Sequence, residues 1–181
     1  SLDFLGDTQD AINEYFANSQ FNKSWVNTSV NSIHPMSLES IRILNESGVE
    51  CASFFMGSTI IIELFTRVQR KISSSHLHVM VDYKGTTLFR TFDTDEIPSL
   101  LSCREKGTYQ NRLIINTTYL KPGKYEVSVD FGIRPSMLFD KYVHLVSFII
   151  NDPEGDFDRG WSERREGVIR APVKWEYKIA R

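Results

Sequence analysis

From about residue 33 onward, apolar and polar residues alternate with a period of two, and turn signals recur every ten to fifteen residues. The clearest case follows the turn Lys121-Pro122-Gly123, where apolar side chains at 125, 127, 129, 131 and 133 alternate with polar or small ones. The same alternation over 75–83 separates an apolar face from a polar face that carries His76 and His78. We expect this polar face to lie toward solvent. Lys84-Gly85 then predicts a hairpin turn into the next strand.

Other segments continue this pattern through the rest of the chain. Further strands are predicted at 38–45, 59–68, 87–92, 112–116 and 142–151, with short final strands at 168–169 and 173–179. A polar stretch near 93–102 is expected to be partly helical. Seven or eight strands without long helices between them predict an all-β fold, an antiparallel β-sandwich of the immunoglobulin-like or jelly-roll type.

The first thirty residues differ in texture from the remainder. Thr8 can cap a short amphipathic helix over 8–17, in which apolar residues recur at three- and four-residue spacing. Residues 18–35 are polar and rich in Asn and Ser, which is typical of a linker, and Trp25 is expected to hold that linker against the sandwich. We therefore divide the chain into residues 1–32, a helix with a linker, and residues 33–181, the sandwich.

Composition narrows the classes of partner. The 181 residues contain 21 Lys and Arg against 23 Asp and Glu, a formal net charge of −2, with no basic cluster, which argues against a nucleic-acid partner. No run approaches the roughly 20 apolar residues that a membrane-spanning helix needs. Cys51 and Cys103 are too few for a disulfide framework and are expected to be free thiols in a reducing compartment.

Two parts of the chain resemble a known family. The segment Gly6-Asp7-Thr8-Gln9-Asp10-Ala11-Ile12-Asn13-Glu14-Tyr15-Phe16 resembles the last segment of ATP-binding subunits in polysaccharide-exporting ABC transporters. The remainder resembles the C-terminal carbohydrate-binding domain of Wzt-type O-antigen exporters. That likeness rests on Gly85 with Leu88-Phe89, on Leu120-Lys121-Pro122-Gly123-Lys124-Tyr125, and on Gly167-Val168-Ile169-Arg170-Ala171-Pro172 with Trp175.

The resemblance implies a role and a set of partners. It implies a non-catalytic sandwich that binds the terminal, non-reducing end of an undecaprenyl-linked O-antigen polysaccharide. It also implies a homodimer that exchanges its last strand, with Val173, Trp175 and Tyr177 in that strand. The partner would be the permease of the transporter, and the location cytoplasmic, at the inner membrane. No Gly-x-x-x-x-Gly-Lys-Ser/Thr motif occurs, so we expect neither ATP hydrolysis nor a cofactor.

Sugar recognition requires aromatic faces and polar side chains on a rigid sheet. Outward-facing strand positions and one loop tryptophan supply the candidates. These candidates are Arg67, His76, His78, Asp130, Arg134, Tyr142, His144 and Trp161. The two arginines would suit an acidic sugar or a phosphate, because a guanidinium matches carboxylate geometry.

The sequence gives weaker support for metal binding. His76 and His78 could coordinate a metal ion, but a site needs a third ligand, and Asp82 would lie about 20 Å from His76 along the strand. No metal site is therefore expected. The acidic segment 152–163 follows the spacing of a calcium loop, yet Phe157 stands where the sharp turn needs glycine, which favours a solvated loop.

Two other functions compete with glycan binding. Glu63, Asp82 and Asp130 could serve a glycan-modifying enzyme only if their sheet faces coincide. A secreted immunoglobulin-like adhesion module is the second competitor, supported by four Asn-x-Ser/Thr sequons and a conceivable Cys51–Cys103 bridge. The antibody-type pattern places a tryptophan between its two cysteines, and no tryptophan lies between Cys51 and Cys103.

Overall fold

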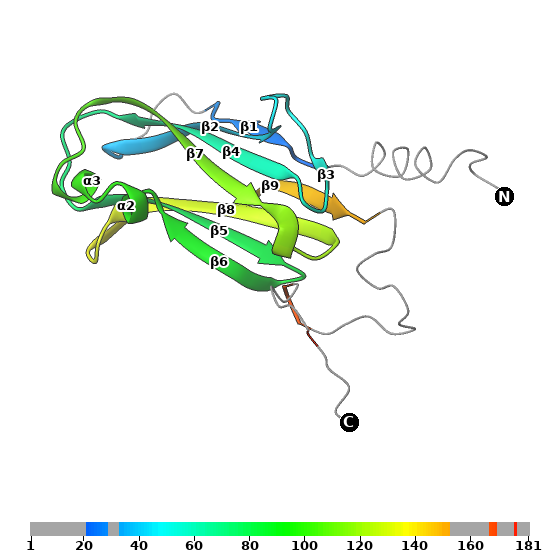
Figure 1. Cartoon of the computed structure of the whole chain (residues 1–181). Helices are drawn as coiled ribbons and strands as arrows, with labels where there is room; N and C mark the ends of the chain where they lie inside the picture. The colour runs from blue at the N-terminus through cyan, green and yellow to red at the C-terminus, as the bar shows by residue number, and fades with distance from the viewer. Residues whose placement is uncertain (1–20, 29–32, 153–166, 170–175, 177–181) are drawn as a thin grey trace.

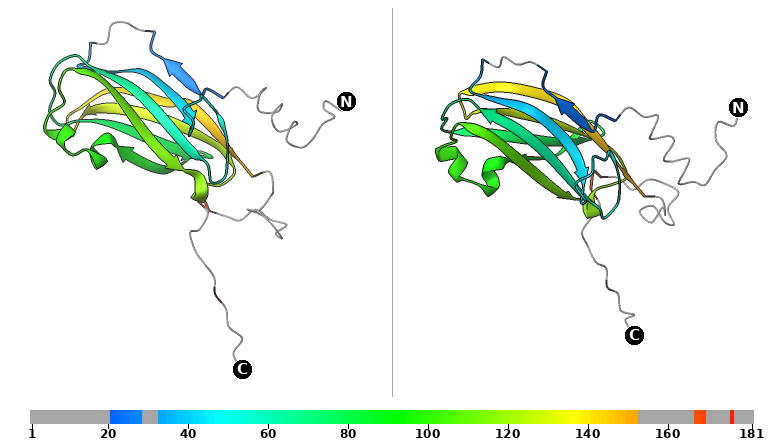
Figure 2. Two further views of the ribbon diagram at one scale, coloured as in Figure 1. Left: turned by 45° about the horizontal axis from the view of Figure 1, so that its top comes forward. Right: turned by 90° about the horizontal axis from the view of Figure 1, so that it is seen from above.

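The computed structural model describes residues 21–28, 33–152, 167–169 and 176. Their strands form two stacked sheets, as Figures 1 and 2 show. The four-stranded sheet, sheet A, has the order β1 (Ser24–Val26), β2 (Met36–Asn45), β4 (Thr59–Val68), β7 (Gly107–Asn116). The five-stranded sheet, sheet B, has the order β3 (Ser53–Phe55), β9 (Met137–Asn151), β8 (Gly123–Ile133), β5 (Ser75–Tyr83), β6 (Thr86–Phe92).

Strand pairing is antiparallel except at one sheet edge, where β3 runs parallel to β9. Two one-turn helices, α2 (Asp93–Glu96) and α3 (Ser99–Ser102), connect β6 to β7, and a 3₁₀ turn at Thr117–Tyr119 follows β7. The all-β sandwich that the alternation predicted is therefore confirmed. The predicted partly helical stretch at 93–102 is confirmed as well.

The core lies between the two sheets. Inward side chains of β4 and β8, such as Ile62, Leu64, Val127 and Phe131, are at most 1% exposed. Aromatic rings continue this packing, because Tyr125 stacks on Tyr83 at 4.8 Å and on Phe148 at 5.1 Å between ring centroids. Such pairs contribute about 0.5–1.5 kcal/mol each beyond the burial of their area. The inward face of β8 is thus the one that its alternation predicted.

Two turns follow from the chemistry of their residues. Lys84 and Gly85 both have positive φ, 50° and 76°, as a two-residue hairpin turn requires, so the predicted hairpin between β5 and β6 is confirmed. Gly123 begins β8 with φ 137°, and a Cβ there would lie 3.0 Å from the Tyr83 ring. Only glycine combines that backbone angle with that close approach.

The structure differs from the predicted linker. Ser24–Val26, inside the polar stretch 18–35, form strand β1 and pair with residues 40–42 of β2, so sheet A includes residues before the predicted boundary at residue 32. Three residues carry too little periodicity to be recognised without their partner strand. Trp25 contacts Tyr142 at 4.9 Å between ring centroids, which confirms its predicted packing on the sandwich.

Several predictions fall elsewhere in the chain. Ile169, in the first of the predicted final strands, makes an antiparallel bridge with Leu120. Outside the described residues lie the helix predicted at 8–17, the candidate Trp161, and the dimer-strand residues Val173, Trp175 and Tyr177. Within the described part of the chain, no helix is long and apolar enough to cross a membrane.

The two cysteines are free thiols that lie far apart. Cys51 precedes β3 by two residues, whereas Cys103 directly follows α3, and β3 and α3 occupy opposite ends of the sandwich (Figure 1). Cys51 donates to the Ser53 carbonyl and Cys103 to the Glu105 carboxylate. A Cys51–Cys103 bridge, which would support the secreted adhesion module, does not fit this fold.

Gly132 provides a test of strand packing. A Cβ at Gly132 would lie 2.2 Å from the backbone oxygen of Met137 in the neighbouring β9, whereas a Cβ at Gly107 would meet nothing within 4 Å. We expect Gly132→Ala to lower the free energy of unfolding by about 1–3 kcal/mol, as overpacking does. Gly107→Ala, the matched control in another strand, should change it little. Urea unfolding of both variants measures the difference, and equal effects would contradict the packing described.

Candidate functional site

The polar face of β5 lies on the outer side of sheet B. Its inward residues Leu77 and Val79 belong to the core, so His76, His78, Met80 and Asp82 point the other way. The partner strand β8 places four residues opposite them. His76 lies opposite Gly132, His78 opposite Asp130, Met80 opposite Ser128, and Asp82 opposite Glu126. The register thus gathers polar groups from two strands on one outer face.

Five residues at one end of this face form what we call the histidine cluster: His76, His78, Phe92, Asp130 and Arg134. His78 Nδ1 lies 2.8 Å from Asp130 Oδ2. The Phe92 ring stacks on His78 at 4.5 Å and meets His76 edge-on at 5.6 Å between centroids. The Arg134 guanidinium carbon lies 3.7 Å from the centre of the same Phe92 ring. Four predicted contacts are therefore brought together around one phenylalanine.

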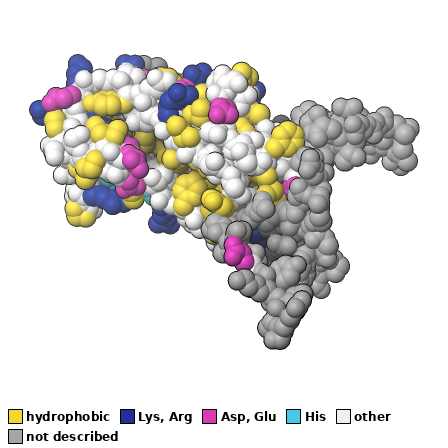
Figure 3. All heavy atoms as spheres, in the orientation of Figure 1, with side chains coloured by type: hydrophobic (Ala, Val, Ile, Leu, Met, Phe, Trp, Pro, Cys, Tyr) yellow, Lys and Arg dark blue, Asp and Glu magenta, His cyan; other side chains and the backbone are white. Residues whose placement is uncertain are grey.

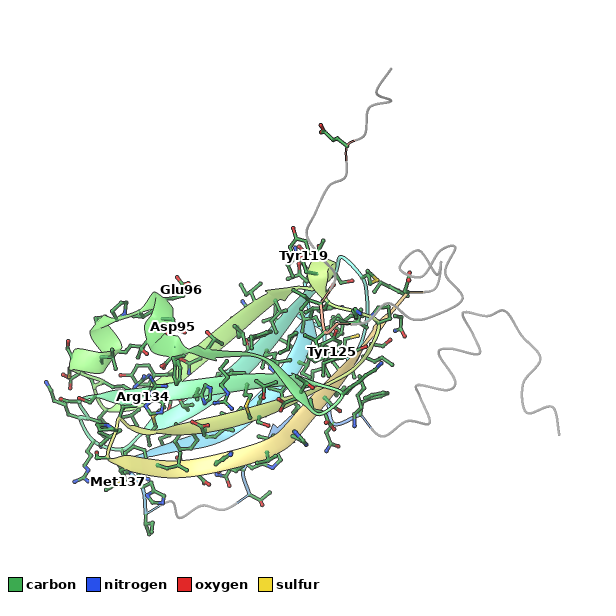
Figure 4. The ribbon with its side chains drawn as sticks, turned by 90° about the horizontal axis from the view of Figure 1, so that it is seen from below. Asp95, Glu96, Tyr119, Tyr125, Arg134 and Met137 are labelled. Carbon is green, nitrogen blue, oxygen red and sulfur yellow. The ribbon has the colours of Figure 1, made fainter. Side chains whose placement is uncertain are left out.

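Figure 4 shows where this cluster lies. Arg134 is at the same end of the molecule as Asp95 and Glu96 of α2, whereas Tyr119 and Tyr125 lie at the other end. On the face that Figure 3 shows, acidic and basic side chains of the described residues are interspersed and form no large area of a single sign.

The expectation that His76 and His78 face solvent is wrong. Their exposed fractions are 8% and 7%, because Phe92 at the end of β6 packs against both rings. Phe92 was not predicted as a site residue. The hairpin turn at 84–85 predicts that β6 lies beside β5, which is part of the information needed to find Phe92. The exact pairing of Phe92 with His78 depends on a register shift at 81–82, which the sequence does not reveal.

Both imidazoles retain unused hydrogen-bonding capacity. His76 Nδ1 and His78 Nε2 are buried and have no hydrogen-bond partner among the described residues. Leaving a buried polar atom unsatisfied costs about 1–3 kcal/mol. A carboxylate can only accept, so His78 Nδ1 donates to Asp130, and Nε2 is the ring nitrogen left without a partner. The cluster therefore holds hydrogen-bonding groups that the fold itself does not use.

Burial and neighbouring charges set the protonation states. Burial, assisted by the positive charge of Arg134, lowers the pKa of His76 below its usual value. For Asp130, burial acts to raise the pKa, but the hydrogen bond from His78 and the charges of His78, His76 and Lys141 outweigh it and lower the pKa. Near neutral pH the site thus presents an ionised Asp130 beside a neutral His76.

A second group on the same face lies around His144. His144 Nε2 is 3.4 Å from Asp82 Oδ2, and Nδ1 is 3.7 Å from Glu126 Oε2. Its backbone nitrogen donates to Ser128 Oγ at 3.0 Å, at a register shift in β9 where His144 has φ 49°. The bulge turns His144 onto the outer face, so this predicted candidate shares the face of the histidine cluster.

Two predicted contacts lie elsewhere. Arg67 is on β4 of sheet A, paired with Glu39, so this candidate does not share the outer face of sheet B with the histidine cluster. Tyr142 lies opposite Val129, an inward residue, and its ring packs on Trp25, so it does not join the cluster. Both differences arise from strand order and register, which sequence alternation does not specify.

The carboxylates proposed for hydrolysis do not meet. Glu63 lies on sheet A, bound to Arg42 and Gln110. Asp82 and Asp130 share the outer face of sheet B but are offset by four residues, about 13 Å at ~3.3 Å per residue. Glycosidases hold their two carboxyl groups roughly 5–9.5 Å apart. The arrangement therefore does not match a glycosidase.

The environment of Glu63 also differs from that of a catalytic acid. Its burial acts to raise the pKa, but hydrogen bonds from Arg42 and Gln110, and the charges of Arg42 and Arg112, lower the pKa overall. A general acid needs the opposite shift. Among the described residues, no group of three or more His, Cys, Asp and Glu side chains could hold a metal ion.

Comparison with known proteins gives a likeness of fold. No family model matches the chain, and no curated protein matches its sequence. The crystal structure of the C-terminal domain of Wzt is similar, with a TM-score of 0.62, 12% identity, and coverage of 98% of this chain and 99% of that one. A Niemann-Pick type C2 protein from the Japanese carpenter ant aligns over 70% of this chain and all of its own, at 10% identity and a TM-score of 0.47.

The first likeness confirms the predicted fold, because the chain has the β-sandwich of the Wzt C-terminal domain. At 12% identity it carries no residue roles to this chain. The second likeness is too distant to support an argument.

The buried state of His76 predicts a dependence of stability on pH. The folded chain resists protonation of His76 because its pKa is lowered, whereas the unfolded chain takes up the proton near pH 6.5. The free energy of unfolding should therefore fall as the pH decreases below about 6.5. Because the pKa of Asp130 is lowered as well, protonation of Asp130 reduces the free energy of unfolding further, but only below about pH 4.

Urea unfolding between pH 8 and pH 5 tests this dependence. The groups whose charges act on His76 are Arg134, Asp130, His78 and Asp93. His76→Gln removes the titrating ring, so this variant should lose less stability over that range than the native protein. Identical pH profiles of the two proteins would refute the assignment.

Proposed function

We propose that this domain binds a glycan on the outer face of sheet B and does not cleave it. The observation that carries the proposal is the gathering of His76, His78, Asp130 and Arg134 around Phe92. The Asp130 carboxylate and the Arg134 guanidinium, the latter held over the Phe92 ring, can select hydroxyl or acidic groups of a sugar. Groups held on paired strands are rigid, which favours selective binding.

The lipid-linked glycan that the sequence resemblance implies is our preferred ligand. The motifs of the Wzt-type carbohydrate-binding domain and the shared fold support the terminal, non-reducing end of an O-antigen polysaccharide as that ligand. The domain would then select polysaccharide for an ABC transporter. In that role it would act beside the permease at the cytoplasmic side of the inner membrane.

Two observations disfavour the competing functions. The offset of Asp82 from Asp130 disfavours hydrolysis of the glycan. The placement of Cys51 and Cys103 near opposite ends of the sandwich disfavours an immunoglobulin-type disulfide. A binding module is the function that agrees best with both.

Titration calorimetry with the polysaccharide of the source strain tests the site. We expect Arg134→Ala and Asp130→Asn each to weaken binding at least tenfold, since a hydrogen bond to a charged group contributes about 1.5–3 kcal/mol. Arg67→Ala is the matched control, because Arg67 is an exposed arginine in the other sheet. Circular dichroism checks that each variant folds. Undiminished affinity in both site variants would place the glycan elsewhere, and no binding by the native protein would refute the function.

We also propose that the domain forms a homodimer by exchanging its last strand. Residues 173–179 alternate apolar with charged residues, a pattern that suits addition to a sheet edge. Deletion of residues 173–181 should yield monomers or insoluble protein, measured by size-exclusion chromatography with light scattering. A soluble dimer after the deletion would contradict the exchange.

A further inference from the structure

The two sheets enclose a pocket at one long side of the sandwich. Sheets A and B contact each other where β1 and β2 cross β9, while β7 and β6 form edges of the two sheets. A cavity of about 210 Å³ opens between β7 on one side and the end of β6 with α2 on the other. It lies on the inner side of sheet B, whereas the histidine cluster lies on the outer side.

The interior of this pocket is apolar. Its floor is formed by Leu64 from sheet A and by Leu77 and Val79 from sheet B, which are 1%, 2% and 5% exposed. Leu113 on β7 lines the wall, and Ile97 after α2, 52% exposed, lies at the mouth. An exposed isoleucine beside an open apolar cavity loses contact with water when a ligand enters, which favours binding.

The charged residues around the pocket leave its interior apolar. On the α2 side, Asp93 is neutralised by Arg104 at 2.7 Å, and Glu96 makes no ion pair within the described ranges. On β7, Arg112 pairs with Glu63 at 3.5 Å on the outer face of sheet A, away from the pocket. Burying a charge in the apolar interior would cost free energy, which favours a neutral ligand.

One side-chain amide on the inward face of β7 defines the polar end of that ligand. Asn111 pairs with the inward Leu64 and donates from Nδ2 to Thr66. Its nitrogen is thus engaged within sheet A, while its carbonyl oxygen retains capacity to accept a hydrogen bond. A hydroxyl group suits this acceptor.

We propose that this pocket binds a small neutral amphipathic alcohol. Its body would be one aromatic ring or an alkyl chain of about six to eight carbons, because an apolar protein cavity of roughly 150 Å³ holds a benzene molecule. The hydroxyl lies against the side-chain carbonyl of Asn111. This site uses the opposite face of β5 from the glycan site, and Phe92 borders both sites.

A series of 1-alkanols from butanol to decanol, titrated into the whole chain and followed by NMR, tests the pocket. We expect affinity to rise about fourfold per methylene, levelling off near seven or eight carbons when the cavity is full. Hexylamine and hexanoate at pH 7 should bind at least tenfold more weakly than 1-hexanol. No saturable binding, equal binding of the three six-carbon probes, or affinity that keeps rising to decanol would overturn the proposal.

Variants on β7 locate the binding. Leu113→Trp fills the cavity and should abolish 1-hexanol binding, whereas Ile114→Trp, the next residue on the opposite face and 65% exposed, should leave it unchanged. If Leu113→Trp does not fold, Ile97→Asp at the exposed mouth should weaken 1-hexanol binding at least tenfold. Undiminished binding in either pocket variant would refute this location. The probes contain no sugar, so these outcomes are separate from those of the glycan experiment.

Discussion

The pairing of β5 with β8 is the constraint on which the candidate site depends. β5 lies inside sheet B, flanked by β6 and β8, and almost all of its side chains are buried on both faces. A strand buried on both faces usually consists of apolar residues, but this one carries two histidines and an aspartate on its outer side. Those polar groups need partners, and β8 supplies Asp130 directly opposite His78. One register therefore determines burial, charge and the position of the cluster together.

The cluster stabilises the sheet and also leaves hydrogen-bonding groups unused. The Asp130 carboxylate and the stacked Phe92 ring hold His78 in one orientation, which stabilises the outer face. Two ring nitrogens nevertheless remain without partners among the described residues, and they carry a cost in folding free energy. Unsatisfied polar groups of this kind are more often found where a ligand binds than where packing alone decides. This is the physical basis for regarding the face as a recognition surface.

The two faces of strands β5 and β6 differ in chemistry. Outward residues of β5 and β6 form a polar surface suited to hydroxyl-rich ligands, and their inward neighbours line an apolar pocket. The pocket exists because the sheets contact each other along β2 and β9 and leave edges at β6 and β7. Period-two alternation produces this division, since successive side chains of a strand point to opposite faces. The C-terminal domain of Wzt has a similar fold at 12% sequence identity.

The sequence by itself determined the local features of this protein. Alternation identified the main strands, and Lys84-Gly85 identified the hairpin, because both signals depend on neighbouring residues. His76, His78, Asp130 and Arg134 were recognised as polar positions in strands for the same reason. The tertiary structure alone decided that Phe92 covers the histidines, that Arg67 lies in the other sheet and that Tyr142 turns inward. Strand order and register shifts bring together residues tens of positions apart, and alternation within a strand is the same whichever strand lies beside it.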